Sequence, residues 1–288
     1  MLNLGLIGDI QMLEPFTKRA QEHPQIHIAG KSSVGTQPLH GSSRISAPEF
    51  NRIELIERSD ALFINRFSLL PFQLICDIVK KSKHFFAAGY PELTADECSQ
   101  VLKLKNEAQT VIQVINPFYY LPALQWLNEN LRKPSFTEVT FFNEDAPSTD
   151  LLIKLLLMLK SITRHTPKKT GAVSFRSEPA SSSYSSCLLE YSNGTLLKIN
   201  SGNMSRKKEF TVKSYAGNQF VLIDVLGEKA ACNNSTIDLA AYKKKTETEA
   251  FIQSIIQNRP PETGIEDYCS VVQTVKTILS RLGQFTSY

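Results

Sequence analysis

The first residues whose spacing suggests chemistry follow an apolar run at the start of the sequence. Leu2–Ile7 has the composition of a buried β-strand and leads directly into Gly8-Asp9-Ile10. In dinucleotide-binding folds this turn reads G-x-G-x-x-G: its glycines permit the tight turn, the approach of backbone to the pyrophosphate, and close helix packing. Here Ile10 and Leu13 replace the second and third glycines. Gly8, Asp9 and Ile10 are therefore candidate cofactor-binding residues, although a purely structural strand–turn–helix explains the segment equally well.

A second candidate follows the next predicted strand, Gln25–Ala29, where Lys31, Ser32 and Ser33 come after Gly30. An acidic residue at this place holds the ribose hydroxyls of NAD, and none of the three is acidic. An amine with two hydroxyls suits the 2′-phosphate of NADP instead. If the chain binds a dinucleotide, the sequence therefore favours NADP over NAD.

The residue types that ligate metals are too scattered to form a site. His23 and His27 are four residues apart, but Pro24 between them prevents a shared helical face. The cysteines never occur as C-x-x-C, which argues against zinc and fits reduced thiols in the cytoplasm. They are Cys76, Cys98, Cys187, Cys232 and Cys269. We expect no metal site.

Composition excludes several classes of protein. The 288 residues are 42% hydrophobic and 21% charged, as in a soluble globular protein, and the net charge of +4 is too small to indicate nucleic-acid or membrane binding. The most apolar stretch, Leu151–Leu159, contains Lys154 and falls far short of the roughly 18 residues that a membrane span needs. The start of the sequence lacks the basic region of a signal peptide. We expect a soluble, cytoplasmic protein with no nucleic-acid or membrane partner.

These candidate residues need a scaffold, and the first half of the sequence predicts one. Short apolar strands alternate with helical periodicities, the pattern of a parallel sheet covered on both faces. One of the helices has a capping box from Thr94 to Glu97. The pattern predicts a Rossmann-like, doubly wound α/β domain over residues 1–131. Its strands are Leu2–Ile7, Gln25–Ala29, Ala61–Asn65, His84–Ala88 and Thr110–Ile115.

The second half reads differently, as an α+β domain over residues 132–288. After Phe136–Phe142 and a helix over Asp150–Lys160, strand patterns follow one another, with hairpin turns at Asn193-Gly194 and Gly217-Asn218. This predicts a large, mostly antiparallel open sheet. Two apolar helical patterns close the sequence, and these helices are able to pack back on the first domain. The predicted later strands are Ala172–Arg176, Ser185–Tyr191, Thr195–Asn200, Glu209–Tyr215, Phe220–Val225 and Lys229–Cys232.

Two segments carry a family resemblance. Asp60–Ile64 followed by Lys83–Thr94 is similar to D-A-V-x-I … G-K-H-V-x-x-E-K-P-x-x-x-T, and the closing segment from Thr248 to Asp267 is similar to E-x-x-x-F-x-x-A-I … R-P … E-D. Both patterns are typical of the glucose–fructose oxidoreductase/inositol dehydrogenase (Gfo/Idh/MocA) family. The order and spacing of these motifs make the resemblance extend over essentially the whole length.

The resemblance implies an NAD(P)-dependent oxidoreductase that acts on a sugar, a polyol or a derivative. It also implies a homo-oligomer formed through the sheet of the second domain. In the family, the lysine of E-K-P assists proton transfer, but here Gly89 or Tyr90 takes that place and no lysine lies between Lys83 and Lys103. Tyr90 is therefore the candidate proton carrier.

Other family positions also differ in this sequence. The D-x-x-x-H pair maps onto Asp145 and Thr149, so the carboxylate is kept and the imidazole is lost. The T-P-N after the third strand is replaced by a segment that begins Asn65-Arg66. The resemblance thus adds Asp145 as a catalytic candidate and Asn65 and Arg66 as cofactor-binding candidates.

Two functions remain open from the sequence. One is an NAD(P)-dependent oxidoreductase with degenerate cofactor and catalytic motifs, in which Tyr90 and Asp145 move protons. The alternative is a catalytically inactive family member that serves as a ligand-binding, regulatory or assembly protein. The joint absence of two glycines, the lysine and the histidine motivates the alternative, because together these losses are hard to reconcile with hydride transfer.

Overall fold

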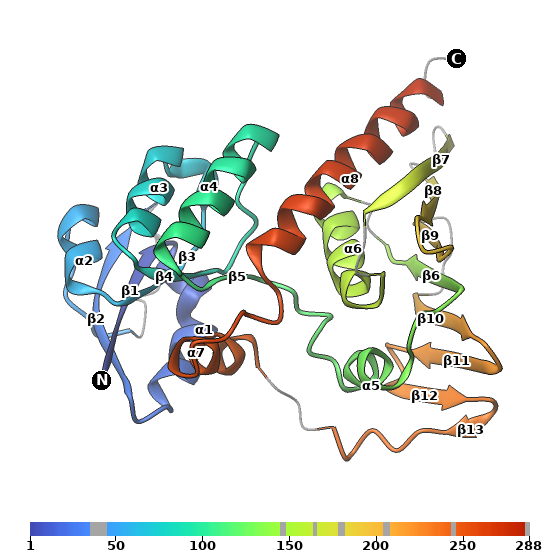
Figure 1. The fold of residues 1–288 in the computed structure, drawn as a ribbon, viewed down its shortest axis with the longest axis horizontal. Helices are drawn as coiled ribbons and strands as arrows, with labels where there is room; N and C mark the ends of the chain where they lie inside the picture. The colour runs from blue at the N-terminus through green and yellow to red at the C-terminus, as the bar shows by residue number, and fades with distance from the viewer. Residues whose placement is uncertain are drawn as a thin grey trace. The chain divides into compact units, whose positions relative to one another are not determined.

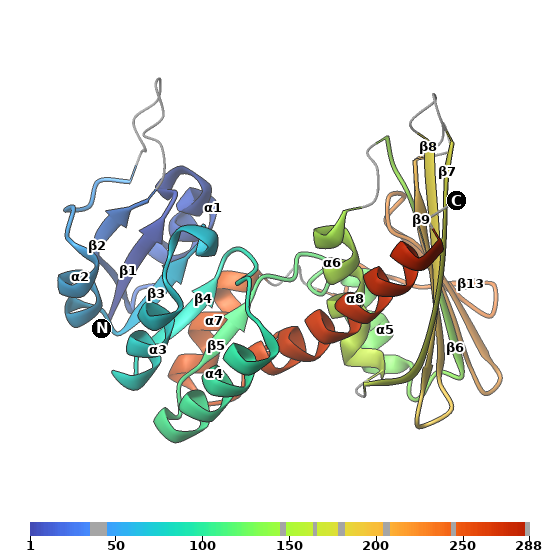
Figure 2. The ribbon, with the colours of Figure 1, turned by 90° about the horizontal axis from the view of Figure 1, so that it is seen from above.

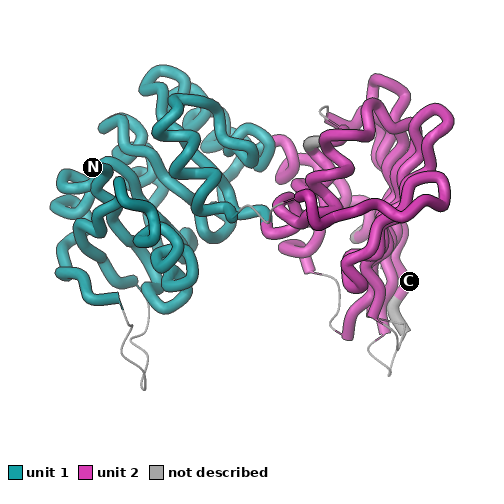
Figure 3. The backbone as a smooth tube through the Cα atoms, turned by 90° about the horizontal axis from the view of Figure 1, so that it is seen from below, with its two compact units in different colours: residues 1–116, 245–269 teal, residues 117–244, 270–288 magenta. Residues whose placement is uncertain are grey.

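A computed structural model describes residues 1–34, 45–144, 148–163, 166–177, 182–203, 208–242 and 246–285. The chain forms two compact units, each described here by itself (Figure 3). Unit 1 comprises residues 1–116 and 245–269, and unit 2 comprises residues 117–244 and 270–288. The sequence alone predicted a single boundary after residue 131. The structure instead assigns residues 117–131 to unit 2 and a late segment of the chain to unit 1.

Unit 1 is built on a five-stranded parallel sheet in the order β2-β1-β3-β4-β5 (Figure 1). The strands are β1 (Leu2–Gly8), β2 (Ile26–Ser33), β3 (Ala61–Ile64), β4 (His84–Ala87) and β5 (Ile112–Val114). Its helices are α1 (Ile10–Gln21), α2 (Arg52–Arg58), α3 (Phe72–Lys80), α4 (Ala95–Ala108) and α7 (Glu247–Ile256), with a 3₁₀ turn at Phe67–Leu69. Figure 1 shows α3 and α4 on the opposite side of the sheet from α1 and α7. The doubly wound α/β prediction is confirmed.

A cluster of aromatic rings explains why α7 belongs to unit 1. The ring of Phe251 on α7 lies 5.9 Å from that of Phe63 on β3 and 6.0 Å from that of Phe86 on β4. Phe16 on α1 contacts Phe86 edge to face at 5.2 Å. Phe63, Phe86 and Phe251 are fully buried. One face of the sheet is therefore closed by a helix from near the end of the chain.

Unit 2 contains an eight-stranded sheet in the order β13-β12-β11-β10-β6-β9-β8-β7. Every pairing is antiparallel except that of β6 with β9, which confirms the mostly antiparallel prediction. The strands are β6 (Phe136–Phe142), β7 (Pro167–Ser177), β8 (Ser182–Tyr191), β9 (Leu196–Gly202), β10 (Glu209–Ala216), β11 (Gln219–Asp224), β12 (Lys229–Cys232) and β13 (Ser235–Thr236). The helices are α5 (Pro122–Asn130), α6 (Thr149–Thr163) and the part of α8 (Ile265–Phe285) that follows residue 269.

Helices cover only one face of the unit 2 sheet. Figure 2 shows α5 and α6 on the same side of it. Side chains that point to that side are buried, among them Val139, Leu189 and Val212, while alternate residues on the same strands are more exposed. Among the described residues, no helix is long and apolar enough to cross a membrane.

Candidate functional site

The predicted cofactor residues come together where β1 and β3 end. The chain runs from β1 outward to β2 and then returns to the other side of β1 for β3, so the two strands are neighbours. At such a reversal, α/β folds bind ligands in the crevice at the carboxyl ends of the strands. Gly8 and Asp9 close β1, and Asn65 and Arg66 follow β3. These four residues therefore lie at the same edge of the sheet.

Asn65 ties the two strand ends together. The backbone N–H of Asp9 donates to Asn65 Oδ1 at 2.7 Å, and Asn65 Nδ2 donates to the Asp9 carbonyl at 3.0 Å. Asn65 is 2% exposed, so this pair of hydrogen bonds is shielded from water. Gly8 has φ +124°, and a Cβ added there would stand 2.0 Å from Asn65 Oδ1. Gly8 is needed because the Asn65 amide lies against its α-carbon.

The Asp9 carboxylate caps α1. Its Oδ1 accepts hydrogen bonds from the backbone N–H groups of Gln11 at 3.1 Å and Met12 at 3.2 Å. Its Oδ2 lies 3.4 Å from the Arg66 guanidinium. Asp9 is the single residue between β1 and α1. The N–H groups at a helix N-terminus bind phosphate in dinucleotide folds, and here a carboxylate of the chain holds two of them.

The predicted strand Gln25–Ala29 extends further in the structure, so Lys31, Ser32 and Ser33 are the last residues of β2, and they are also bonded within the chain. Lys31 Nζ donates to the Ile45 carbonyl at 3.3 Å. The backbone N–H and the hydroxyl of Ser33 donate to the Glu49 carboxylate at 2.6 and 3.1 Å, and Ser32 is buried. The sequence predicted an amine and two hydroxyls without a nearby acid. Glu49 escaped notice because it lies 16 residues beyond Ser33 and reaches it only through the fold.

The two catalytic candidates differ in what the structure shows of them. Tyr90 follows β4, and its ring stacks on that of Tyr268 with 5.8 Å between centroids and 6° between planes. The Tyr90 hydroxyl is buried, and the Tyr268 hydroxyl donates to the Pro91 carbonyl beside it. Asp145 lies outside the described residues.

Sequence reasoning missed a titratable group at the same edge of the unit 1 sheet. Glu247 begins α7, and its Oε1 accepts the Asn116 backbone N–H at 2.5 Å, just beyond β5. Gln113 Nε2 on β5 donates to the Glu247 carbonyl at 2.8 Å. Burial raises the pKa of Glu247 to about 7, against the opposing effects of the Asn116 N–H and the Arg19 charge. In the sequence, Glu247 looks like any acid in a first helical turn.

No metal centre is present in the part of the chain that the structure describes: no three His, Cys, Asp or Glu side chains gather there as a metal would need. His23 and His27 share no helical face, and His27 Nδ1 lies 3.3 Å from Asn3 Oδ1.

Comparison with known proteins finds the same architecture in solved structures. No protein-family model matches the sequence, and no curated protein matches it significantly. Solved structures match over nearly the whole length. UDP-N-acetylglucosamine 3-dehydrogenase GnnA from Acidithiobacillus ferrooxidans is 17% identical, with 99% of this chain and 98% of that chain covered and a TM-score of 0.76. A putative myo-inositol dehydrogenase from Sinorhizobium meliloti 1021 is 12% identical, with coverages of 99% and 98% and a TM-score of 0.74.

The chain has the fold of the Gfo/Idh/MocA dehydrogenases. Biliverdin reductase from Synechocystis sp. PCC 6803, solved with biliverdin and NADP⁺, is also similar, at 11% identity, coverages of 98% and 99%, and a TM-score of 0.72. The resemblance inferred from the sequence is confirmed at the level of the fold. At these identities the likeness shows the fold alone.

The residues at the strand ends do not fit the dinucleotide of such dehydrogenases. A diphosphate would have to displace the Asp9 carboxylate from α1, and the β-branched Ile10 stands where a glycine lets backbone approach the phosphates. Arg66, which follows β3, is already paired with Asp9. At the ribose side, the Glu49 carboxylate would oppose a 2′-phosphate.

Proposed function

We propose that this chain is a ligand-binding or regulatory protein with a dehydrogenase fold, and that it does not carry out dinucleotide-dependent hydride transfer. One observation supports the proposal above the others: the Asp9 carboxylate holds the N-terminus of α1 where a diphosphate would be bound. The absence of the family's lysine and histidine agrees with it. The ligand class that the fold suggests is a small polyhydroxylated molecule, such as a sugar, a polyol or a derivative.

The first test is a titration of the protein with NADH and NADPH. Nucleotide fluorescence and thermal shift are read on the same samples. We expect no saturation by either nucleotide up to millimolar concentration. Saturation at micromolar concentration would overturn the proposal and would justify screening sugars and polyols as substrates.

A second candidate is an NAD(P)-dependent oxidoreductase acting on a sugar, a polyol or a derivative. It is favoured by the full-length likeness to GnnA and to a reductase solved with NADP⁺. In that case Tyr90 and Asp145 carry protons and Lys31 faces the cofactor. This candidate requires saturable binding of NADPH that Lys31→Glu weakens at least tenfold. It is rejected if the unchanged protein binds neither nucleotide.

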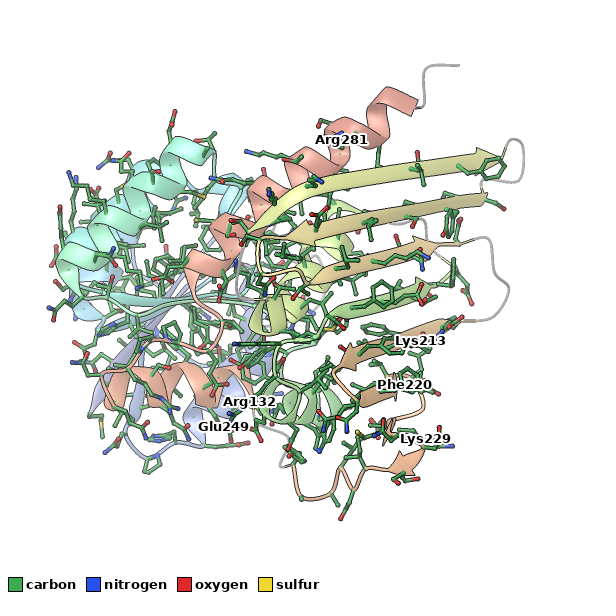
Figure 4. All side chains as sticks on the ribbon, turned by 45° about the vertical axis from the view of Figure 1, so that its right-hand side comes forward. Arg132, Lys213, Phe220, Lys229, Glu249 and Arg281 are labelled. Carbon is green, nitrogen blue, oxygen red and sulfur yellow. The ribbon has the colours of Figure 1, made fainter. Side chains whose placement is uncertain are left out.

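We also propose that copies of the chain associate through the uncovered face of the unit 2 sheet. Figure 4 labels three side chains of this face on adjacent strands, Lys213 on β10, Phe220 on β11 and Lys229 on β12. Large apolar side chains that are more than a third exposed lie on the same face: Val173, Phe175, Leu188, Tyr215 and Leu222. Sedimentation should show an oligomer at micromolar concentration, and Leu188→Lys should dissociate it. A monomer at every concentration would contradict the proposal.

We further propose a cytoplasmic location. None of the five cysteines forms a disulfide, and four of them are buried. Unpaired thiols persist in a reducing compartment. Cell fractionation tests this, and recovery of the protein with secreted markers would contradict it.

A further inference from the structure

We infer that Asp9 acts as a built-in anion that occupies a latent phosphate-binding site, so that removing its charge creates an anion site at the N-terminus of α1. This inference rests on the proposed function, since it supplies the physical reason for the loss of dinucleotide binding. The site consists of the first N–H groups of α1 and the Arg66 guanidinium.

The geometry of Asp9 matches that of a bound oxyanion. One carboxylate oxygen receives the N–H groups of Gln11 and Met12 at 3.1 and 3.2 Å, and the other lies 3.4 Å from Arg66. The backbone of Asp9 is fixed on both sides by the buried Asn65 amide. The carboxylate is therefore held in place by its own chain, and it needs no rearrangement to keep the donors satisfied.

The charges at this point are close to balanced. A helix N-terminus carries about half a positive charge, Arg66 adds one, and Asp9 subtracts one. The first turn of α1 holds no other acidic residue after Asp9. A diphosphate that approached would meet a fixed negative charge and two N–H groups already engaged. Without Asp9, the same place would present donors and a net positive charge.

The site faces solvent, so a solute could reach it once Asp9 is replaced. The Asp9 side chain is 31% exposed and that of Arg66 is 52% exposed. The end of β2 shows the same arrangement, because Glu49 takes both donors of Ser33. Two places at the carboxyl edge of this sheet thus have donors that internal carboxylates satisfy.

Two variants separate the effect of the Asp9 charge from the effect of its oxygen, which occupies the N–H groups of α1. Asp9→Asn keeps an oxygen that can accept the two N–H groups and removes only the charge, whereas Asp9→Gly removes both. The control is Asp96→Asn, which deletes a carboxylate from the first turn of α4 instead of the N-cap of α1. Calorimetric titrations use inorganic pyrophosphate, ADP and NADH as probes. Thermal melts of each variant confirm that it is folded.

Pyrophosphate should bind most weakly to the unchanged protein and to Asp96→Asn, more tightly to Asp9→Asn, and most tightly to Asp9→Gly. The affinity of Asp9→Gly should exceed that of Asp9→Asn at least tenfold. Adding Arg66→Gln to Asp9→Gly should remove most of the gain. If Asp9→Gly fails to fold, Asp9→Asn alone decides, with at least a threefold gain expected. ADP binding together with pyrophosphate indicates a nucleotide site, and pyrophosphate alone indicates a simple anion site; either supports the inference.

The outcomes distinguish this inference from the proposed function. If the unchanged protein binds NADH or NADPH at micromolar concentration, the proposed function fails and this inference fails with it. If the unchanged protein binds neither and both Asp9 variants bind pyrophosphate no better than Asp96→Asn does, only the inference is overturned. A gain that persists unchanged when Arg66 is replaced also overturns the site as assigned.

Discussion

At the scale of single residues, Gly8 and Asn65 decide how β1 passes into α1. The glycine has a positive φ, and the asparagine amide fills the space where a side chain at residue 8 would point. A Cβ at this place meets both a strained backbone and a clash. The sequence identified Gly8 as a tight-turn glycine. It could not reveal that Asn65 makes the glycine necessary, since the two residues meet only when β1 and β3 pair.

Gly8→Ala should therefore lower the free energy of unfolding by about 2–4 kcal/mol, from backbone strain and overpacking together. Urea denaturation measures the loss. The double variant Gly8→Ala/Asn65→Ala removes the clash but not the positive φ, so part of the loss caused by the first substitution should be recovered in a mutant cycle. Equal costs of Gly8→Ala in the presence and absence of the Asn65 side chain would contradict this account.

The raised pKa of Glu247 predicts that the stability of the protein depends on pH, and it determines the sign of that dependence. In the folded chain this carboxyl titrates at about 7, against an ordinary value of 4.5. Between these values the unfolded chain has lost the proton and the folded chain retains it, so stability from this group is full below pH 4.5 and falls as the pH rises through 7.

Glu247→Gln should be more stable than the unchanged protein at pH 8, by as much as about 3 kcal/mol, and similar to it near pH 4.5. The amide can still accept the Asn116 N–H. Urea denaturation across this range provides the measurement, with the exposed Glu249→Gln as the matched control. Parallel pH profiles for the unchanged protein and Glu247→Gln would show that burial does not perturb this carboxyl.

At the scale of elements, the local sequence pattern predicted most strands, but it did not predict which distant strands and helices lie beside them. The hairpins at Asn193-Gly194 and Gly217-Asn218 form as predicted, with both glycines at positive φ. The parallel pairing of β6 with β9 was not predicted, because periodicity specifies which face of a strand is buried and not which strand lies beside it. The same limit explains why α7 was predicted as a helix able to pack back on the first domain, while its contacts with Phe63 on β3 and Phe86 on β4 were not predicted.

The assignment of α7 predicts unequal costs for a buried and an exposed apolar side chain. Phe251→Ala should destabilise the protein by about 3–5 kcal/mol, because the fully buried ring contacts Phe63 and Phe86. Ile53→Ala, at 70% exposure on α2, should cost less than about 0.5 kcal/mol. Denaturant titrations of both variants compare them directly. Similar costs would mean that α7 does not close the unit 1 sheet.

At the scale of the whole molecule, the two units do not simply follow one another along the chain, as the sequence had predicted that they would. The chain leaves unit 1 after Asn116, returns at residue 245 and leaves again after Cys269. Composition and pattern indicated two domains and their classes. They allowed the closing helices to pack back on the first domain but could not indicate which of them does so, since nothing local distinguishes a helix that packs on a neighbouring element from one that packs on a distant one.

A chain of residues 1–131 should therefore not fold cooperatively, because it lacks α7 and leaves Phe63 and Phe86 uncovered on one face. Residues 1–116 joined to 245–269 by a short glycine–serine linker should fold, since Asn116 and Glu247 are already hydrogen bonded. Circular dichroism melts of the two chains test this. A sharp melting transition for residues 1–131 would contradict the discontinuous unit.

The late arrival of α7 also bears on how the protein is made. A ribosome synthesises β1 to β5 long before it reaches Phe251, and domains whose chain is complete tend to fold as they emerge. Unit 1 cannot do so, because the helix that covers Phe63 and Phe86 is translated only after the strands of unit 2. The apolar face of its sheet therefore stays open to chaperones until α7 has left the exit tunnel.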